Sequence, residues 1–121
     1  MIMETVESFQ SKKCRPCEGG IERLLPHEAL ENLHSLTDWR INQDGLRLEK
    51  EWHVKNFKAG IDFINRVAQV ADDDGHHPEI HLTGFRHVWI EIWTHAVGGL
   101  TENDFILAAK IDLLPIELMP S

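Results

Sequence analysis

The segment DDDGHHPEIHLTGF, residues 72–85, gathers the residue types that most often carry out chemistry. Three consecutive aspartates and a glycine precede the adjacent pair His76 and His77, which is followed by Pro78. Imidazole is the side chain whose unperturbed pKa lies nearest neutrality, so one histidine can hold a proton while another lacks one. Nearby carboxylates favour the protonated ring and apolar surroundings disfavour it, so two histidines can take different roles. The segment indicates acid/base chemistry, and solvated loop histidines without a task are the alternative.

A metal site is a competing interpretation, because neutral imidazole is the commonest metal ligand in proteins. Adjacent residues of an extended segment point to opposite sides, and Pro78 biases His77 toward an extended conformation. His76 and His77 therefore cannot easily chelate one ion together. The helical H-E-x-x-H pattern is absent, and the acidic run does not fit a calcium-binding loop. The other histidines considered as ligands are His81, His87 and His95.

Composition limits the class of protein. The chain has 121 residues, of which 42% are hydrophobic and 26% charged, values typical of one globular domain. A formal net charge of −8 argues against direct binding to nucleic acid, which requires a basic surface. No run approaches the roughly 18 apolar residues of a membrane span, and the first residues do not resemble a signal peptide. We therefore expect no membrane contact and a cytoplasmic location, or an organellar one if a transit peptide has been removed.

The two cysteines, Cys14 and Cys17, lie in the segment KKCRPCEGG. A C-x-x-C pair can supply half of a zinc site, but the chain lacks the second pair. It can also be a redox pair, although no βαβ pattern surrounds it. A segment without either role is the third interpretation. Because residues 1–23 show no sustained periodicity, we treat them as an N-terminal extension and place the domain at 24–121.

Hydrophobic periodicity and turn residues predict seven elements in the order α-β-β-α-β-β-α. Asp44-Gly45 marks a hairpin, and T-E-N-D opens the last helix as a capping box with Thr101 at the N-cap and Asp104 at N3. The pattern predicts an α+β two-layer domain, a four-stranded antiparallel sheet with helices on one face. The expected helices are at 26–36, 56–71 and 101–114, and the expected strands at 39–42, 46–54, 80–83 and 87–94.

Two apolar surfaces bear on packing. In the helix at 56–71, apolar residues step by four and three, which predicts that this stripe faces the core. In the last strand, Trp89 and Trp93 lie on the parity opposite the aliphatic residues, so they form an exposed apolar patch unless something covers them. The predicted helical stripe consists of Phe57, Ile61, Ile64, Ala68 and Ala71, widened by Gly60, Phe63 and Val67.

The run from Phe57 through Ala109 resembles the pterin-4a-carbinolamine dehydratase family. The family's signature is an acidic residue, three positions, His-His-Pro, an aromatic residue, nine positions, a histidine, and an aspartate eight or more positions later. The flanking texts F-x5-F-I-x2-V-A and T-H-x2-G-G-L-T-x2-D-F agree as well. In this chain the signature consists of Asp72, His76, His77, Pro78, Phe85, His95 and Asp104.

This resemblance implies dehydration of a 4a-hydroxytetrahydrobiopterin-type carbinolamine to quinonoid dihydropterin, without a metal or another cofactor. A proton must reach the departing 4a-hydroxyl, and a proton must leave N5. By matching positions, His76, His77 and His95 form the catalytic pocket. The resemblance makes His76 and His95 the proton-transfer pair and His77 the residue that positions the substrate.

The remaining matched positions are expected to contact the substrate or to tune the rings. Asp104 would orient an imidazole or a pterin nitrogen in addition to capping its helix, and Asp72 would bias ring protonation. Pro78 and Phe85 complete the expected substrate-binding set. Six residues separate Pro78 from Phe85 where the family usually has five, which predicts a bulge or a longer turn before the fourth strand.

Other roles remain open. Family members also act as dimerisation cofactors of a homeodomain transcription factor, and relatives serve as assembly factors for Rubisco. A third alternative is a dehydratase-like protein acting on another pterin, such as one in molybdopterin metabolism. The presence of all three histidines favours the enzyme. The expected partners are a small pterin substrate and further copies of the chain, as a homodimer or homotetramer.

Overall fold

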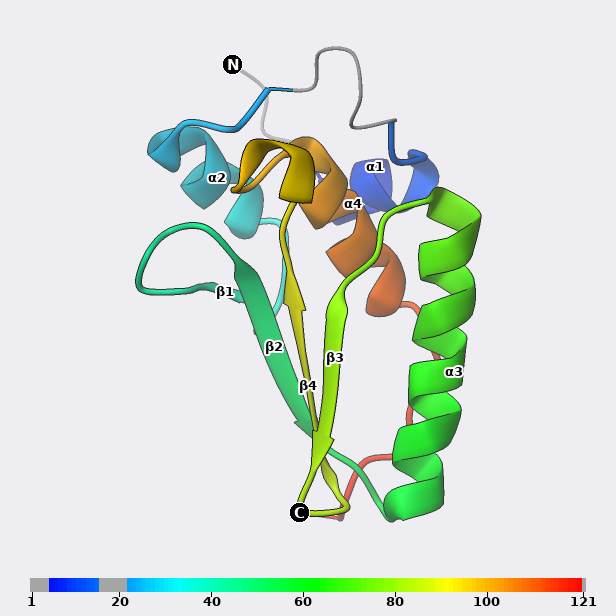
Figure 1. Cartoon of the computed structure of the whole chain (residues 1–121). Coiled ribbons are helices and arrows are strands. Elements are labelled where there is room, and N and C mark those ends of the chain that lie inside the picture. The colour runs from blue at the N-terminus through cyan, green and yellow to red at the C-terminus, as the bar shows by residue number, and fades with distance from the viewer. Residues whose placement is uncertain (1–4, 16–21, 121) are drawn as a thin grey trace.

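The computed structural model describes residues 5–15 and 22–120, so Cys17 lies outside the described residues. Figure 1 shows the predicted order of helices and strands, with a short helix before it and a 3-10 helix before the last helix. The elements are α1 (Val6–Ser11), α2 (Pro26–Leu33), β1 (Arg40–Ile41), β2 (Leu48–His53), α3 (Phe57–Asp74), β3 (Glu79–Thr83), β4 (His87–Ile92), the 3-10 helix η1 (His95–Val97) and α4 (Glu102–Ile111).

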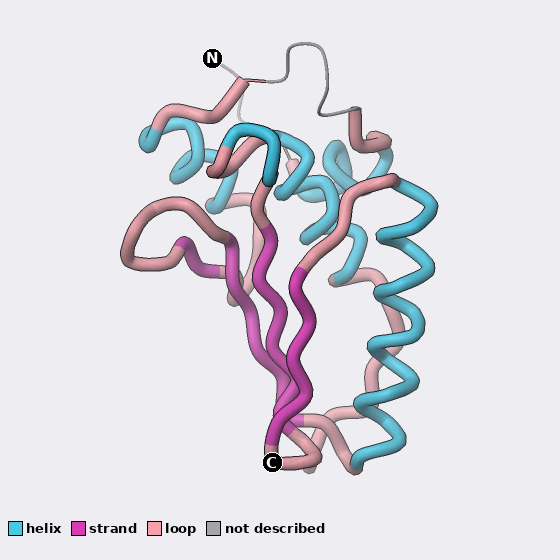
Figure 2. The backbone as a smooth tube through the Cα atoms, viewed as in Figure 1, coloured by secondary structure: helices cyan, strands magenta, loops and turns pink. Residues whose placement is uncertain are grey.

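The four strands form one antiparallel sheet in the order β1-β2-β4-β3. In Figures 1 and 2, α3 runs along the sheet for most of its height and α4 lies behind its upper half. The predicted two-layer α+β domain is confirmed. Within the described part of the chain, none of the helices combines the length and apolar character needed to cross a membrane.

The strands bury alternate residues, as their period of two predicts. Leu48 and Val54 in and beside β2, and Val88, Ile90 and Ile92 of β4, are fully buried under the helices. The register pairs Leu48 with Ile92 and Lys50 with Ile90, so side chains from two strands share each level of the core. This packing fixes the register of β4 relative to its neighbouring strands.

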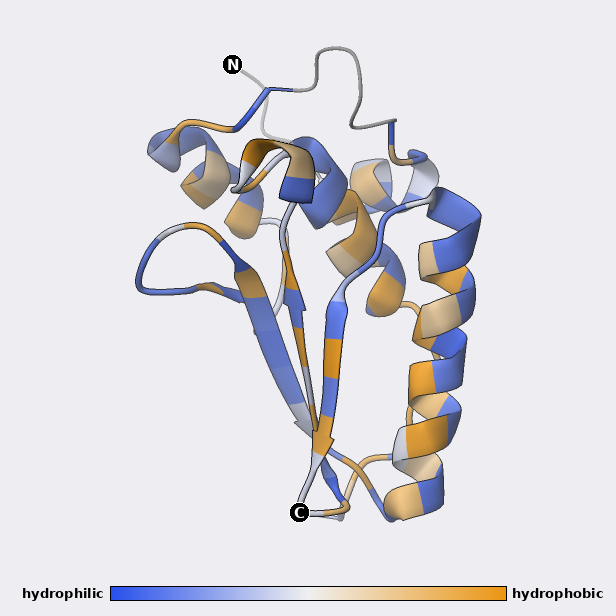
Figure 3. Ribbon diagram, in the orientation of Figure 1, coloured by the Kyte–Doolittle hydropathy of each residue, from blue (hydrophilic) through white to orange (hydrophobic). Residues whose placement is uncertain are grey.

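Of the predicted stripe, α3 buries Gly60, Phe63, Val67 and Ala71, while other members reach solvent. Asn56 caps the helix by accepting a hydrogen bond from the Ala59 N–H at 2.8 Å, as N-cap residues do. Phe63 is 1% exposed, whereas Phe57 is 54% exposed and Ile61 also reaches solvent. A Cβ on Gly60 would lie only 3.3 Å from side-chain atoms of the sheet side, so this glycine permits the close approach. The contact with the sheet therefore selects the face around Gly60 and Phe63. In Figure 3 the apolar colour of α3 is concentrated on the side of the ribbon nearest the sheet.

The N-terminal residues form an element that periodicity did not predict. Six residues are too few for a periodic pattern, and an isolated helix of this length is unstable in water. The helix α1 is stabilised by packing, because Phe9 is fully buried with its ring centroid 6.1 Å from that of Phe105 in α4. The N-terminal segment, residues 5–15, thus packs against the rest of the domain.

The extra residue between Pro78 and Phe85 does not interrupt the pairing of β3 with β4. The register from Glu79 paired with Glu91 to Thr83 paired with His87 is continuous, so the paired part of β3 and β4 contains no bulge. Gly84 and Phe85 both adopt positive φ, at 54° and 53°. Of the two predicted consequences, a bulge is absent from this strand pairing, and the longer turn stays a prediction.

Phe63→Ala tests the face of α3 that packs. Because Phe63 is 1% exposed, its truncation should lower the free energy of unfolding by about 3–5 kcal/mol. Phe57→Ala on the same helix is the matched control, and we expect a change below about 1 kcal/mol. Urea denaturation followed by circular dichroism measures both variants. A larger loss for Phe57→Ala would mean that the opposite face packs.

Candidate active site

Three segments meet at one end of the sheet. Because β3 and β4 are antiparallel, the residues before β3 lie beside the residues after β4. Figure 1 shows the end of α3, the start of β3 and the segment that follows β4 at the upper end of the molecule. His76 and His77 precede β3 and His95 follows β4, so the fold brings all three to this end.

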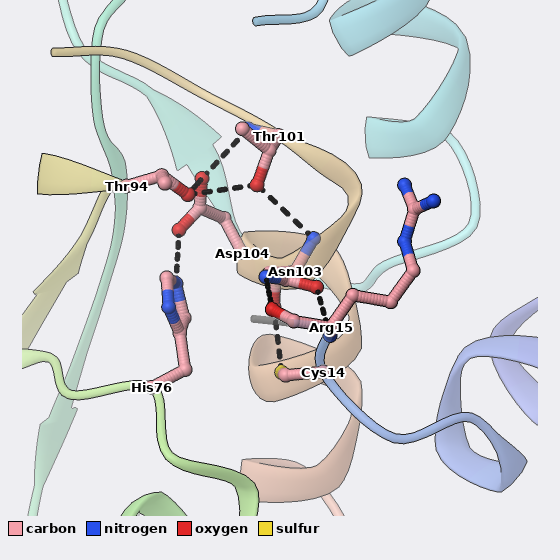
Figure 4. A network of polar contacts seen from close by, with 7 residues as sticks. All are labelled: Cys14, Arg15, His76, Thr94, Thr101, Asn103 and Asp104. Atoms are coloured by element: carbon pink, nitrogen blue, oxygen red, sulfur yellow. Dashed lines mark hydrogen bonds and ion pairs between the residues drawn. The ribbon is translucent and has the colours of Figure 1, made fainter. Parts of the chain in front are cut away.

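A helix C-cap places His76. Gly75 has the left-handed φ of 65°, and its N–H bonds to the Asp72 carbonyl while the His76 N–H bonds to the Ala71 carbonyl. These two bonds form the Schellman motif, which ends a helix and turns the chain. The turn directs the His76 side chain inward, where it is 5% exposed. Its Nε2 lies 2.6 Å from Oδ1 of Asp104, as Figure 4 shows.

Asp104 is fully buried and accepts hydrogen bonds on both oxygens. Its Oδ2 accepts from the Thr94 hydroxyl at 3.0 Å and from the Thr101 N–H at 2.8 Å. Since a carboxylate only accepts, His76 must donate its Nε2–H to Oδ1. The neutral His76 ring then keeps Nδ1 as the nitrogen that can take up a proton. The predicted capping box of Thr101 and Asp104 is confirmed.

A closed loop presents His95. Thr94 pairs with Gly99, with 2.9 Å from the Thr94 nitrogen to the Gly99 oxygen, and Gly98 adopts a φ of 61° that allows the tight return. The His95 ring is exposed and stacks on Trp93 with centroids 4.3 Å apart. The guanidinium of Arg47 lies 4.0 Å from the centre of the same indole. His95 is therefore held on an aromatic support and remains accessible to solvent.

Trp89 of β4 and Trp93, which follows the strand, are both covered on the open face of the sheet. His81 stacks on Trp89 with centroids 3.6 Å apart, and His95 and Arg47 lie against Trp93. The apolar patch predicted for these tryptophans is thus shielded by rings and a guanidinium. Glu91 joins the arrangement, since Arg47 donates to it at 2.8 Å and the Nε2 of His81 lies 3.0 Å away. Burial alone would raise the pKa of Glu91, but these two partners outweigh it and lower the pKa below its usual range.

His77 points away from the buried pair. Its side chain is largely exposed, and its Nε2 lies 2.9 Å from Oδ1 of Asp72, which is exposed as well. Pro78 is half-buried and leads directly into β3. The structure therefore places His77, Asp72 and Pro78 at the outer edge of the site and His76 inside it.

Phe85 is not brought to this end. It lies in the turn after β3, and the five residues of that strand span more than about 15 Å. Its side chain is exposed at the lower end, and the Arg86 guanidinium lies 5.1 Å from its ring. Within one chain, the expected contact between Phe85 and a substrate at the histidines therefore does not form.

The sequence pattern missed most of the residues that support the site. Thr94 and Thr101 bind Asp104 or each other, and Trp93 with Arg47 supports His95. Thr94 fits the alternation of β4, and Arg47 reaches the site through the pairing of β2 with β4, which no local pattern reveals. The local signals were the capping box, which singled out Thr101, and the position of Thr94 directly before His95.

The end of the sheet that carries His76, His77 and His95 is called the histidine end below. The described residues do not enclose it, since His77 and His95 reach solvent. A cavity of about 840 Å³ lies elsewhere, with Trp52, Phe63 and Asp112 among its lining residues, and the three histidines do not line it. Among the residues that the structure describes, no group of three or more His, Cys, Asp or Glu side chains is arranged to hold a metal ion.

Comparison with known proteins identifies the family. The family model described as pterin 4 alpha carbinolamine dehydratase matches residues 22–114. The chain belongs to the pterin-4a-carbinolamine dehydratase family. The match includes every residue of the His76, Asp104 and His95 arrangement, and it leaves out the N-terminal segment.

Relatives in this dehydratase family occur in plants and bacteria. The chain is 46% identical over 116 residues to pterin-4-alpha-carbinolamine dehydratase 2, mitochondrial, of Arabidopsis thaliana, covering 93% of this chain and 62% of the relative. A protein of Dechloromonas aromatica assigned to the same family is 41% identical, with 93% and 97% covered. The crystal structure of a transcriptional coactivator/pterin dehydratase from Brucella melitensis has a TM-score of 0.71 and 27% identity, covering 76% of this chain and 97% of that one.

Asp104→Ala tests the buried network of this dehydratase-family domain. The change leaves donors of His76, Thr94 and Thr101 without their acceptor, so we expect the free energy of unfolding to fall by about 3 kcal/mol. Asp72→Ala is the control, because it removes only an exposed pair and should change stability little. Thermal and urea unfolding compare the two. Equal losses would contradict the buried network.

Cys14 should be unreactive in the folded chain. Burial, reinforced by the neighbouring Asp74 carboxylate, raises the pKa of its thiol to about 12. Only about one thiol in ten thousand is then ionised at pH 8, and the thiolate is the reactive form. In the Cys17→Ser variant, a chromogenic disulfide reagent should not modify the native protein but should modify one thiol in denaturant. Rapid reaction of the native protein would contradict this burial.

Proposed function

We propose that this chain dehydrates a 4a-hydroxytetrahydropterin, a carbinolamine, to quinonoid dihydropterin and water by general acid/base catalysis with histidines. The observation that carries the proposal is the buried pair of His76 and Asp104, 2.6 Å apart, at the same end of the sheet as His95. These residues occupy the positions that the family resemblance marks for catalysis. The family supplies the reaction class, and the geometry supports the division of roles.

The reaction requires two proton transfers. The C4a–O bond breaks as the 4a-hydroxyl receives a proton and leaves as water. The N5–H bond also breaks, and its electron pair forms the N5=C4a double bond. An acid and a base in separate positions are needed, and each transfer of this kind typically contributes about 10² to 10⁴ in rate.

The environments of His76 and His95 suit them to different transfers. We assign His76 as the base, because Asp104 accepts from its Nε2–H and stabilises the imidazolium that forms when Nδ1 takes up the N5 proton. We assign His95 as the acid, because its exposed ring can regain a proton from solvent after each turnover. The Trp93 support limits the orientations of that ring.

The outer residues fit a role in substrate positioning. His77 and Asp72 form an exposed pair at 2.9 Å beside the buried histidine. A planar pterin that approaches His76 must pass these groups, which offer hydrogen-bond donors and acceptors to its polar edge. Pro78 stiffens the chain between His77 and β3.

Alanine substitution tests the acid/base assignment. His76→Ala and His95→Ala should each lower turnover by about 10² to 10⁴, because each removes one proton-transfer group. His34→Ala changes an exposed histidine in the segment after α2 and should keep full activity. Stopped-flow absorbance with chemically generated carbinolamine measures all three. Wild-type turnover in both site variants would overturn the assignment.

The same assay separates the alternatives. The Brucella melitensis relative is named both as a transcriptional coactivator and as a pterin dehydratase, so a binding role is the second candidate. A folded wild-type chain with no activity on any carbinolamine would favour that role. Activity on a carbinolamine with a different C6 side chain would favour another pterin, such as one in molybdopterin metabolism.

We also propose that the chain self-associates, as a homodimer or a homotetramer. The support is the exposed apolar ridge of α3, in which Phe57 is 54% exposed and Ile61 is 37% exposed. Large apolar side chains side by side on a helix are typical of a contact surface. This ridge replaces the covered tryptophans as the candidate contact.

A further inference from the structure

We propose that the N-terminal segment, residues 5–15, positions the His76–Asp104 pair, and that Asn103 transmits this effect. The part of the proposal that concerns turnover rests on the proposed function. The part that concerns the geometry of the pair does not. Asn103 and Arg15 are thus positioning residues, which act on the reaction through Asp104.

Side chains attach the segment along α4. Phe9 is fully buried against Phe105, and the Gln10 side-chain amide donates to the Ala109 carbonyl at 3.3 Å. Lys12 forms a 2.8 Å ion pair with Glu102, the first residue of α4. These contacts extend along α4 from Ala109 in its last turn to Glu102 at its N-terminal end. The contacts place Cys14 and Arg15 beside the first turn of α4, where Asp104 also lies.

Asn103 holds the backbone of the segment. Its Oδ1 accepts from the Arg15 N–H at 2.9 Å, and its Nδ2 donates to the Arg15 carbonyl at 2.7 Å. The Cys14 thiol lies 3.5 Å from the Asn103 carbonyl oxygen. Asn103 is 1% exposed, so these contacts are shielded from solvent. Asn103 binds backbone atoms of Arg15, so these two hydrogen bonds do not depend on the Arg15 side chain.

Hydrogen bonds lead from Asn103 to the catalytic pair in one direction. The Asn103 N–H donates to the Thr101 hydroxyl oxygen at 3.2 Å, and the hydroxyls of Thr101 and Thr94 lie 2.7 Å apart. Because Thr94 donates its single proton to Asp104, Thr101 must donate to Thr94. Every donor in the series therefore points toward the carboxylate that holds His76. Figure 4 draws the residues that these bonds connect.

The position of Asn103 in the helix makes it sensitive to the segment. The first turn of a helix has N–H groups without partners in the helix, and it frays more readily than the interior. Asn103 and Asp104 both lie in this turn. In Figure 4 the segment approaches the turn from the side away from His76, so the turn is held from both sides. Release of the segment should loosen Asp104 and, with it, the orientation of the His76 ring.

Two substitutions at Arg15 separate the backbone contact from the side chain. Arg15→Pro removes the N–H that donates to Asn103, whereas Arg15→Ala keeps both backbone contacts. Asn103→Ala removes the side-chain amide itself. If Arg15→Pro does not fold, this variant tests whether the contact positions the His76–Asp104 pair. All variants are made in the full chain, and their folding is checked by circular dichroism.

The first readout is the low-field proton resonance of the His76 Nε2–H, which a 2.6 Å hydrogen bond in a buried site should shift and protect from exchange. His76→Ala identifies this signal by its loss. We expect Arg15→Pro and Asn103→Ala to broaden or lose it, and Arg15→Ala to keep it. The second readout is turnover, which should fall at least about tenfold in the first two variants with little change in KM.

Two results would overturn the proposal. One is an unchanged resonance in both Arg15→Pro and Asn103→Ala, and the other is an equal effect of Arg15→Ala and Arg15→Pro. If the wild-type chain shows no dehydratase activity, the proposed function fails while the resonance still decides the positioning role. A loss of the resonance without a change in turnover would limit the effect to the geometry of the pair and overturn its part in catalysis.

Discussion

The site depends on one buried carboxylate. Asp104 is fully removed from solvent, and a buried charge is tolerated only when hydrogen bonds or an opposite charge compensate its loss of hydration. Its three donors are Thr94 after β4, Thr101 at the N-cap of α4, and His76 after α3. The requirement to satisfy one side chain therefore fixes three elements relative to one another and sets the tautomer of the histidine.

Helix ends and tight turns carry the side chains that do chemistry, and the sheet only supports them. His76 follows the Schellman motif at Gly75, and His95 lies in a loop closed by the pairing of Thr94 with Gly99. Both positions are defined by backbone hydrogen bonds, which hold a side chain more accurately than a free loop does. The two histidines consequently have contrasting surroundings, one buried against a carboxylate and one stacked on an exposed indole. That contrast is the physical basis for giving them opposite roles in proton transfer.

The N-terminal segment lies outside the matched family region and yet contacts the support of this site. The family match begins at residue 22, while the contacts of Arg15 with Asn103 lie next to Asp104. A short helix and a few backbone contacts can stabilise the first turn of α4 because that turn lacks internal partners. The segment thus extends the hydrogen-bonded support of the site, and its buried Cys14 serves in packing.

The sequence by itself determined the order of the strands and helices after residue 24, the alternation in β4 and the capping box of Thr101 and Asp104, because these depend on neighbours within a few positions. The signature spacing also singled out His76, His77 and His95. Only the tertiary structure decided which face of α3 is buried, since the stripe was wide and the close approach at Gly60 selects among its sides. The tertiary structure also placed Phe85 away from the histidine end and brought Thr94 and Arg47 to that end. It stabilised the short helix α1 by packing. Each of these outcomes depends on contacts between residues distant in the chain, which local patterns do not encode.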